Sequence, residues 1–192
     1  MGSVQRSDGL SVRRLEEHEA AAAFAQDIGR PLTALVTVVF HGVQNVEEAI
    51  VRLCDSMRHW LRRQGLPAIY LWVKEFGSEH GMHLHLAVHV PAGAVYWAFK
   101  QMVWRWAAQV GAEILRGGTS ETVDVRRIYS INGLMKYLGK SISERDAQKA
   151  HERYGVKRKR HGSVSGRPSQ ACKAIGPMAR EAFYARQADL AA

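Results

Sequence analysis

Between residues 82 and 90 the chain alternates histidines with apolar residues, in the order Met-His-Leu-His-Leu-Ala-Val-His-Val. Successive side chains of a β-strand point to opposite faces of a sheet, so this period of two predicts a strand and not a helix. His83, His85 and His89 then share one face, and the intervening leucines share the other. We therefore expect a sheet with one apolar face and one face that carries polar groups.

Histidines two residues apart on one strand face are typical of a metal site, because two neutral imidazoles can bind one divalent ion and a nearby carboxylate completes an open site. Residues 68–75 are rich in β-branched and aromatic residues, and glycines follow them, which predicts a hairpin with the histidine strand. In this hairpin Glu75 falls opposite His83. Parity also allows Glu79, but we prefer Glu75 because Glu79 would lie in the turn. The predicted donors are His83, His85 and Glu75.

A His-x-His pair alone is weak evidence for a metal, since most histidines on strands are surface residues or hydrogen-bonded core residues. The carboxylate on the same face strengthens the prediction. A tyrosine about fifty residues downstream strengthens it further.

The chain has 192 residues, 46% of them hydrophobic, and five tryptophans, which is enough for one well-filled core. We expect this domain over residues 31–145, with a polar, mobile or loosely docked segment at 1–30 and a basic segment at 146–192. Its two cysteines form no Cys-x-x-Cys pair, which argues against a zinc ribbon, and we expect Cys54 to pack in the core. No apolar run approaches a membrane span and no leader is evident, so we expect a cytoplasmic protein that binds no membrane.

The net charge of +9 makes nucleic acid the first candidate partner. Residues 151–167 are basic and contain glycine and serine, which favours a loop or arm against phosphates, followed by a short helix. A solvated tail is the alternative interpretation. The expected DNA contacts are Lys157, Arg158, Lys159, Arg160 and Arg167.

The apolar patterns predict a strand, a helix, a hairpin of two strands, a helix, a strand and a helix, over residues 32–40, 45–64, 68–90, 95–110, 122–129 and 132–143. A short helix at 15–26 precedes them. The order β-α-β-β-α-β-α predicts an α+β fold in a split βαβ arrangement, with a central antiparallel sheet and helices packed on one face. The open face would carry the histidines.

Tyr137 and Lys140 are three residues apart on the last predicted helix and so point from the same side. A tyrosine is a competent nucleophile toward phosphorus when a metal polarises the phosphodiester and a cation offsets the developing charge. The alternative is that Tyr137 packs and Lys140 is a solvated charge.

The run HGMHLHLAVHV with upstream Glu75, followed by KYLGK, resembles the HUH endonuclease superfamily, specifically the rolling-circle replication initiators of small plasmids and of filamentous or other single-stranded phages. The likeness covers roughly residues 32–143 and implies a ferredoxin/RRM-like fold. It implies Mg²⁺ or Mn²⁺ at His83, His85 and Glu75. It further implies that Tyr137 attacks the scissile phosphate, leaving a 5′-phosphotyrosine and a free 3′-hydroxyl that primes synthesis, and that Lys140 assists.

The expected substrate is single-stranded DNA or an origin hairpin, with a host helicase and polymerase as partners. Position 141 is serine, which implies a one-tyrosine enzyme, so a water, another subunit or Tyr129 would act in the second step. The histidines precede the tyrosine, which argues against conjugative relaxases and leaves small tyrosine transposases open. A non-catalytic nucleic-acid-binding protein, and a phosphodiesterase that activates water with His80 or His89, also remain alternatives.

Overall fold

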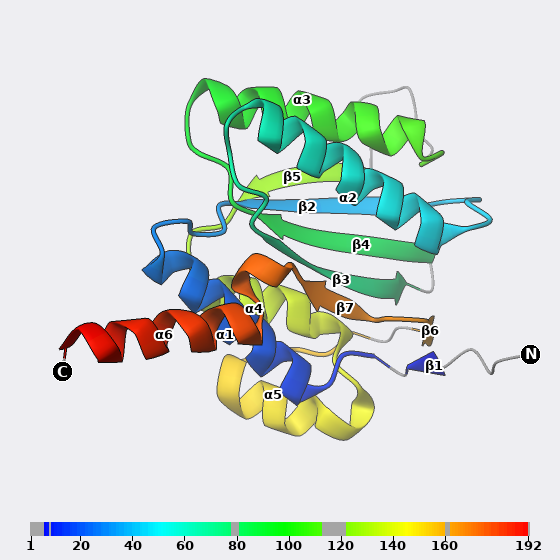
Figure 1. Cartoon of the computed structure of the whole chain (residues 1–192). Coiled ribbons are helices and arrows are strands. Elements are labelled where there is room, and N and C mark those ends of the chain that lie inside the picture. The colour runs from blue at the N-terminus through cyan, green and yellow to red at the C-terminus, as the bar shows by residue number, and fades with distance from the viewer. Residues whose placement is uncertain (1–5, 8, 78–80, 113–121, 160–161, 192) are drawn as a thin grey trace, which may run out of the picture.

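The computed structural model describes residues 6–7, 9–77, 81–112, 122–159 and 162–191. Its centre is an antiparallel sheet of five strands with helices above and below it (Figure 1). In spatial order the strands are β5 (Val123–Arg127), β2 (Ala34–Phe40), β4 (Gly81–Val88), β3 (Tyr70–Gly77) and β7 (Ser169–Ala171). The predicted α+β class and the antiparallel sheet are confirmed.

Two helices cover one face of the sheet and provide the crossovers of the split βαβ arrangement. Helix α2 (Val46–Arg63) connects β2 to β3, and α3 (Ala94–Gln109) connects β4 to β5 (Figure 1). The side chain of Asn45 caps α2 by accepting a hydrogen bond from the backbone N–H of Glu48 at 3.2 Å, as its position before the apolar stripe predicts.

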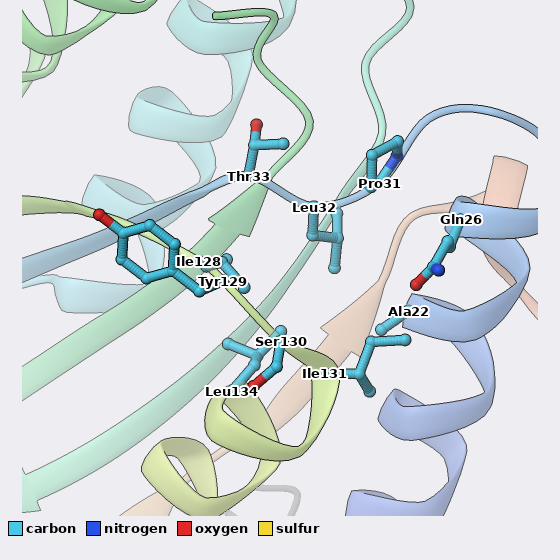
Figure 2. Close-up of a pocket in the computed structure, with 10 residues that line it drawn as sticks. All are labelled: Ala22, Gln26, Pro31, Leu32, Thr33, Ile128, Tyr129, Ser130, Ile131 and Leu134. Atoms are coloured by element: carbon cyan, nitrogen blue, oxygen red, sulfur yellow. The ribbon is translucent and has the colours of Figure 1, made fainter.

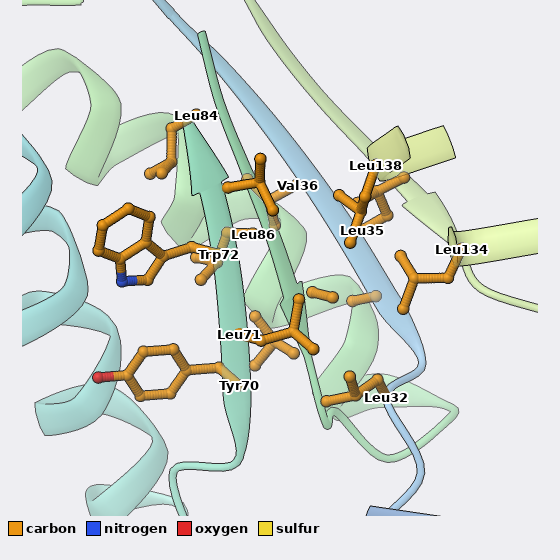
Figure 3. Close-up of a cluster of buried hydrophobic side chains, with 14 of the residues drawn as sticks. Leu32, Leu35, Val36, Tyr70, Leu71, Trp72, Leu84, Leu86, Leu134 and Leu138 are labelled. Carbon is orange, nitrogen blue, oxygen red and sulfur yellow. The ribbon is translucent and has the colours of Figure 1, made fainter. Parts of the chain in front are cut away.

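The second face of the sheet is also covered over part of its area, which corrects the expectation of helices on a single face. Trp72 and Leu84 point toward α2 and α3, whereas Leu35 points toward Leu134 and Leu138 of helix α4 (Ile131–Leu138) (Figure 3). Helix α1 (Val12–Asp27) contacts α4 on this same side. The histidines therefore lie beside a packed helix and not on an open surface.

The N-terminal segment is firmly docked over its described residues from Gly9 onward, unlike the expected mobile or loosely docked segment. Leu15 and Ala25 of α1 are fully buried, and Phe24 is 3% exposed. Phe24 also makes an edge contact with Phe183 at a centroid distance of 5.3 Å. The run of alanines gave only a weak amphipathic pattern, but small side chains allow α1 to approach its neighbours closely.

The segment after residue 145, expected to be a DNA-contacting arm with a short helix, is part of the fold. It contains α5 (Ala147–Tyr154), β6 (Val164–Ser165), β7 and α6 (Pro177–Ala191). Strand β7 pairs with β3 at the edge of the main sheet, and β6 pairs with β1 (Arg6–Ser7). Three short 3-10 turns complete the described elements, η1 (Gly139–Ser141), η2 (Glu144–Asp146) and η3 (Lys173–Ile175).

Two smaller features bear on the predictions from composition. Cys54 is 6% exposed, and burial raises the pKa of its thiol to about 12, so the thiol packs in the core as expected and stays protonated. Among the helices that the structure describes, none combines the length and the apolar character that a membrane span requires.

Candidate active site

The register of three strands brings the predicted polar residues onto one face. Glu75 on β3 pairs with His83 on β4, which confirms the register expected for the hairpin. His85 pairs with Val73 on one side and with Thr37 of β2 on the other. Because side chains alternate along each strand, Thr37, Glu75, His83 and His85 all point toward the side of the sheet that carries α4.

His85 is the buried centre of this group. Its Nε2 atom lies 3.1 Å from Oε2 of Glu75, and the two side chains are 5% and 12% exposed. An ionised carboxylate only accepts hydrogen bonds, so Nε2 carries the hydrogen and donates it to Glu75. The tautomer assigned from this contact leaves Nδ1 of His85 as an acceptor.

Thr37 extends the network from His85 to the predicted nucleophile. Its Oγ1 atom lies 3.1 Å from Nδ1 of His85 and 3.3 Å from the hydroxyl of Tyr137. With Nδ1 as an acceptor, Thr37 donates to His85 and accepts from Tyr137; with a metal on Nε2 the ring hydrogen would be on Nδ1, and both directions would reverse. One chain of hydrogen bonds therefore runs from Tyr137 through Thr37 and His85 to Glu75.

Thr37 was missed in the sequence because threonine is common in strands and fits the surrounding run of valines without suggesting chemistry. One signal was present, since Thr37 is the only residue with a polar side chain between Ala34 and Phe40. Its role depends on a strand pairing that spans 48 positions of sequence, which no local pattern reveals.

Helix α4 places Tyr137 over the histidine face. Leu134 and Leu138 of α4 are 3% and 1% exposed and anchor the helix on the sheet. Tyr137 itself is half-buried, and its ring meets that of His85 edge to face, at 5.1 Å and 86°. The phenol therefore reaches the histidine face of the sheet.

Lys140 lies next to Tyr137, as their spacing predicts, although the helix is shorter than the expected 132–143. Helix α4 ends at Leu138, and Lys140 belongs to turn η1, with its Nζ atom 4.0 Å from the centroid of the Tyr137 ring. Burial lowers the pKa of Lys140, Lys159 and Arg126 lower it further, and Glu75 opposes them. Lys140 is therefore a stronger acid than an ordinary lysine.

The donor set fits a divalent metal in its chemistry and in part of its geometry. Nε2 of His85 and Oε2 of Glu75 are 3.1 Å apart, which matches the separation of about 3 Å between two adjacent ligands that each lie about 2.1 Å from one ion. The ring of His83 is 6.2 Å from that of His85, between centroids. Among the described residues no three donors converge on one point, so His83 would have to rotate to complete the set.

Of the alternative residues Glu79, His80 and His89, the structure describes only His89. Glu79 and His80 lie outside the described residues. His89 lies near the far end of the histidine strand, where its Nδ1 atom is 2.8 Å from the backbone oxygen of Pro31, so the structure does not bring it to His85.

Basic residues of the segment after α5 lie beside η1, the turn that follows Tyr137 and Leu138. The backbone N–H of Lys159 donates to the backbone oxygen of Lys140 at 3.1 Å, and Nε of Arg158 donates to that of Ile142 at 3.2 Å. Lys157 is exposed, as is Lys159. These three predicted contact residues therefore lie close to η1.

The two remaining predicted contacts are Arg167 and Arg160. Arg167 is exposed in the connection before β7, the edge strand that pairs with β3, and Arg160 lies outside the described residues. The structure adds Arg126, which sequence reasoning missed. Arg126 pairs with Leu35 and so points to the histidine face, with its side chain 71% exposed and its Nε atom 2.5 Å from Oδ2 of Asp124.

Comparison with known proteins identifies the family. The sequence model described as replication-associated protein ORF2/G2P matches residues 33–142, more than half of the chain, and this range contains the whole network from Thr37 to Lys140. No curated protein and no solved structure matches the chain. The chain therefore belongs to the replication-associated protein ORF2/G2P family, a family of rolling-circle replication initiators.

Proposed function

We propose that this protein nicks one strand of single-stranded DNA, or of an origin hairpin, at a specific sequence and becomes linked to the 5′ phosphate through Tyr137. The free 3′ end would start rolling-circle replication of a plasmid or phage, with helicase and polymerase supplied by the host. The observation that carries this proposal is the hydrogen-bonded network of Tyr137, Thr37, His85 and Glu75, with the Lys140 ammonium against the tyrosine ring.

The reaction is a transesterification. The phenol oxygen of Tyr137 forms a bond to phosphorus as the bond from phosphorus to the 3′ oxygen breaks. The phenol loses its proton and the 3′ oxygen gains one, so the products are a 5′-phosphotyrosine and a 3′-hydroxyl. One phosphate ester replaces another, so the step needs no nucleotide cofactor.

Two side chains would prepare the tyrosine for this step. Thr37 holds the phenol oxygen beside His85, which restricts the nucleophile to one position. Lys140 offsets negative charge on the phenol and the phosphate. Because its pKa is lowered, Lys140 is also suited to donate a proton to the leaving 3′ oxygen.

The metal ligands of this proposal are His83, His85 and Glu75. A bound Mg²⁺ or Mn²⁺ would supply Lewis-acid polarisation of the scissile phosphodiester. Lys157, Arg158 and Lys159 would hold neighbouring phosphates, which gives affinity without sequence preference.

Strand transfer in the second step would involve a water or a second subunit. Ser141, at the position of the second tyrosine in two-tyrosine relatives, is 1% exposed and bonds the backbone oxygen of Leu138 at 3.1 Å. Tyr129 precedes α4, whereas Tyr137 is near its end, so the helix rise of 1.5 Å per residue separates them by about 10 Å. We therefore give Tyr129 no part in the chemistry.

The test mixes the full chain with Mn²⁺ and labelled single-stranded oligonucleotides from the DNA that flanks its own gene. We expect a protein–DNA band that survives denaturation, that EDTA abolishes, and that Tyr137→Phe removes. Tyr129→Phe is the matched control and should keep the band. Cleavage without a band in the wild-type protein would indicate a phosphodiesterase that uses water, and binding without cleavage of any oligonucleotide would favour a non-catalytic binding protein.

A further inference from the structure

Two exposed aromatic rings lie on the side of the sheet that carries α3, away from the histidine face. Trp97, in the first turn of α3, is 61% exposed, and Tyr129, in the connection between β5 and α4, is 90% exposed. Figure 2 shows the Tyr129 ring directed away from Gln26 and Ile131. Large aromatic side chains usually bury most of their surface, so two rings held in solvent are candidates for binding a flat ligand.

Tyr96 connects these two rings into one surface. Its ring meets that of Trp97 edge to face, with 6.3 Å between the centroids and an angle of 84°. The guanidinium of Arg127 lies over the Tyr96 ring, with Cζ 4.9 Å from the centroid. Burial raises the pKa of Tyr96, Arg127 lowers it and Tyr129 raises it, so Tyr129 also lies within electrostatic reach of Tyr96.

Each part of this surface also carries a cation. Nζ of Lys100 lies 5.9 Å from the centroid of the Trp97 ring, and α3 has no acidic residue. Among the described residues neither Lys100 nor Arg127 forms an ion pair. An arginine that stacks on a ring keeps N–H donors at its edge for phosphate oxygens. Rings for bases beside cations for phosphates are typical of sites for single-stranded nucleic acid, whereas a duplex hides the faces of its bases.

Strand β5 connects this surface to the tyrosine site. In the described part of the chain β5 is an edge strand of the sheet (Figure 1). Arg126 and Arg127 are consecutive on it and so point to opposite faces, Arg127 toward α3 and Arg126 toward the histidines. Arg126 contributes, after burial and Lys159, to the lowered pKa of Lys140. The carboxylate of Asp124 is paired with Arg126, so a phosphate chain that crosses this edge meets little uncompensated negative charge.

We propose that this surface binds unpaired DNA that flanks the nick. We call it the aromatic edge, and it consists of Trp97, Lys100, Arg127 and Tyr129. The two rings stack on bases and the two cations contact phosphates. The strand then crosses β5 at Arg126 and reaches Tyr137. This inference rests on the proposed function for the path beyond Arg126, but binding at the aromatic edge can be measured without cleavage.

The first test measures affinity by fluorescence anisotropy of a labelled oligo-dT of about 16 nucleotides, the upper end of the site sizes of single-strand-binding folds, with the full chain in EDTA. Trp97→Ala and Tyr129→Ala should each weaken binding about tenfold, as expected when one stacked base is lost. Trp97→Phe and Tyr129→Phe keep a ring and should retain most of the affinity. Neither alanine variant should change the affinity for a duplex of the same length.

Two further measurements report direct contact. Stacking on Trp97 should quench the tryptophan fluorescence of the protein when oligo-dT binds, and Trp97→Phe should lose most of this quenching while it keeps its affinity. Lys100→Gln and Arg127→Gln should each reduce the slope of log affinity against log salt by about 0.7, the value for one phosphate contact on a single strand.

Matched controls separate this inference from the proposed chemistry. Tyr137→Phe should bind oligo-dT as the wild type does, so failure of cleavage does not affect the result. Tyr184→Ala removes a ring that is 48% exposed on α6 and should leave the affinity unchanged. Wild-type affinity in both Trp97→Ala and Tyr129→Ala, an equal loss in Tyr184→Ala, or an equal loss for the duplex would overturn the inference.

Discussion

The Oγ1 atom of Thr37 lies 3.3 Å from the hydroxyl of Tyr137, although the two residues are 100 positions apart in the sequence. The same oxygen lies 3.1 Å from Nδ1 of His85. A single hydroxyl on the central part of the sheet thus joins the histidine strand to the helix that carries the proposed nucleophile.

Thr37→Val should slow cleavage while the DNA affinity stays unchanged. Valine has nearly the same shape as threonine, so the substitution removes the hydroxyl that positions the phenol and little else. We expect the rate of adduct formation to fall by about 10- to 100-fold, the range of one to two hydrogen bonds at about 1.4 kcal/mol for each factor of ten. Single-turnover kinetics at saturating DNA measure this rate.

Thr37→Ser is the matched control, since it keeps the hydroxyl and should retain most of the activity. An equal loss in both variants, or a loss of affinity in place of rate, would contradict a positioning role for Thr37.

Lys140→Met should reduce the cleavage rate by about 10²- to 10³-fold, the cost of removing one group that stabilises charge in a transition state. Burial, Lys159 and Arg126 lower the pKa of Lys140 below the usual 10.5. The wild type should therefore lose activity at a lower pH than it would with a lysine of ordinary pKa. Lys140→Arg keeps its charge and should move this alkaline loss to higher pH. Identical pH profiles of the cleavage rate for the wild type and Lys140→Arg would contradict a role for the Lys140 charge in cleavage.

Local periodicity was sufficient to predict the sheet and part of the site. The alternation around His83 and His85 fixed a strand with two distinct faces, and the short turn of the hairpin left one natural register for Glu75. Likewise, the apolar stripe and the Asn45 cap were enough to predict α2. Each of these features depends on neighbours within a few residues.

The remaining features depend on contacts between distant parts of the chain. The docking of α1 uses alanines such as Ala21 and Ala25, whose burial comes from the fit to neighbouring elements and not from a strong pattern. Strand β7 is only three residues long, so it exists only because β3 offers it an edge. The cavity of about 330 Å³ lined by Leu32, Ile128 and Ile131 (Figure 2) requires α1, α4 and the connections before β2 and after β5 together, and no single segment predicts it.

Mn²⁺ should raise the melting temperature of the wild-type protein, because a ligand that binds only the folded state stabilises it. We expect Glu75→Gln and His85→Gln to lose most of this increase, since the two side chains lie at the spacing of adjacent metal ligands. His89→Gln is the control, because His89 contacts Pro31 away from the site. The measurement is a thermal melt with and without Mn²⁺, and an unchanged increase in Glu75→Gln would exclude that carboxylate as a ligand.

The stability of the fold should fall in mild acid because of His18. This histidine is 2% exposed, its ring nitrogens have no hydrogen-bond partner among the described residues, and burial, with a smaller contribution from Arg14, lowers its pKa from 6.5 to about 4. Above pH 6.5 both states are neutral and the stability is complete. As the pH falls from 6.5 toward 4, the unfolded chain takes up a proton that the folded chain excludes.

The resulting loss should approach about 3 kcal/mol, at about 1.4 kcal/mol for each unit of pKa. Urea unfolding at pH 7.5 and pH 4.5 measures it. His18→Leu should remove this part of the pH dependence, whereas His59→Gln, at an exposed position of α2, should not. An unchanged pH dependence in His18→Leu would assign the acid sensitivity to other groups.

Gly139→Ala should destabilise the protein and disturb the basic residues beside Tyr137. Gly139 has ordinary helical dihedral angles, so alanine fits the backbone. A Cβ atom at this position would, however, lie 2.6 Å from Cγ2 of Val156 and 3.1 Å from Cδ2 of Leu15, both on buried side chains. We expect a loss of about 1–3 kcal/mol from overpacking, measured by urea unfolding.

Val156→Ala in the same chain should restore part of this stability, because it removes the closer methyl group. The contact also has a functional consequence, since it lets the chain before Lys159 lie against η1, where the N–H of Lys159 bonds the backbone oxygen of Lys140. Gly139→Ala should therefore weaken single-stranded DNA binding and slow adduct formation, and the double variant should recover both. A stable Gly139→Ala protein with wild-type binding would show that this close approach does not position the two lysines.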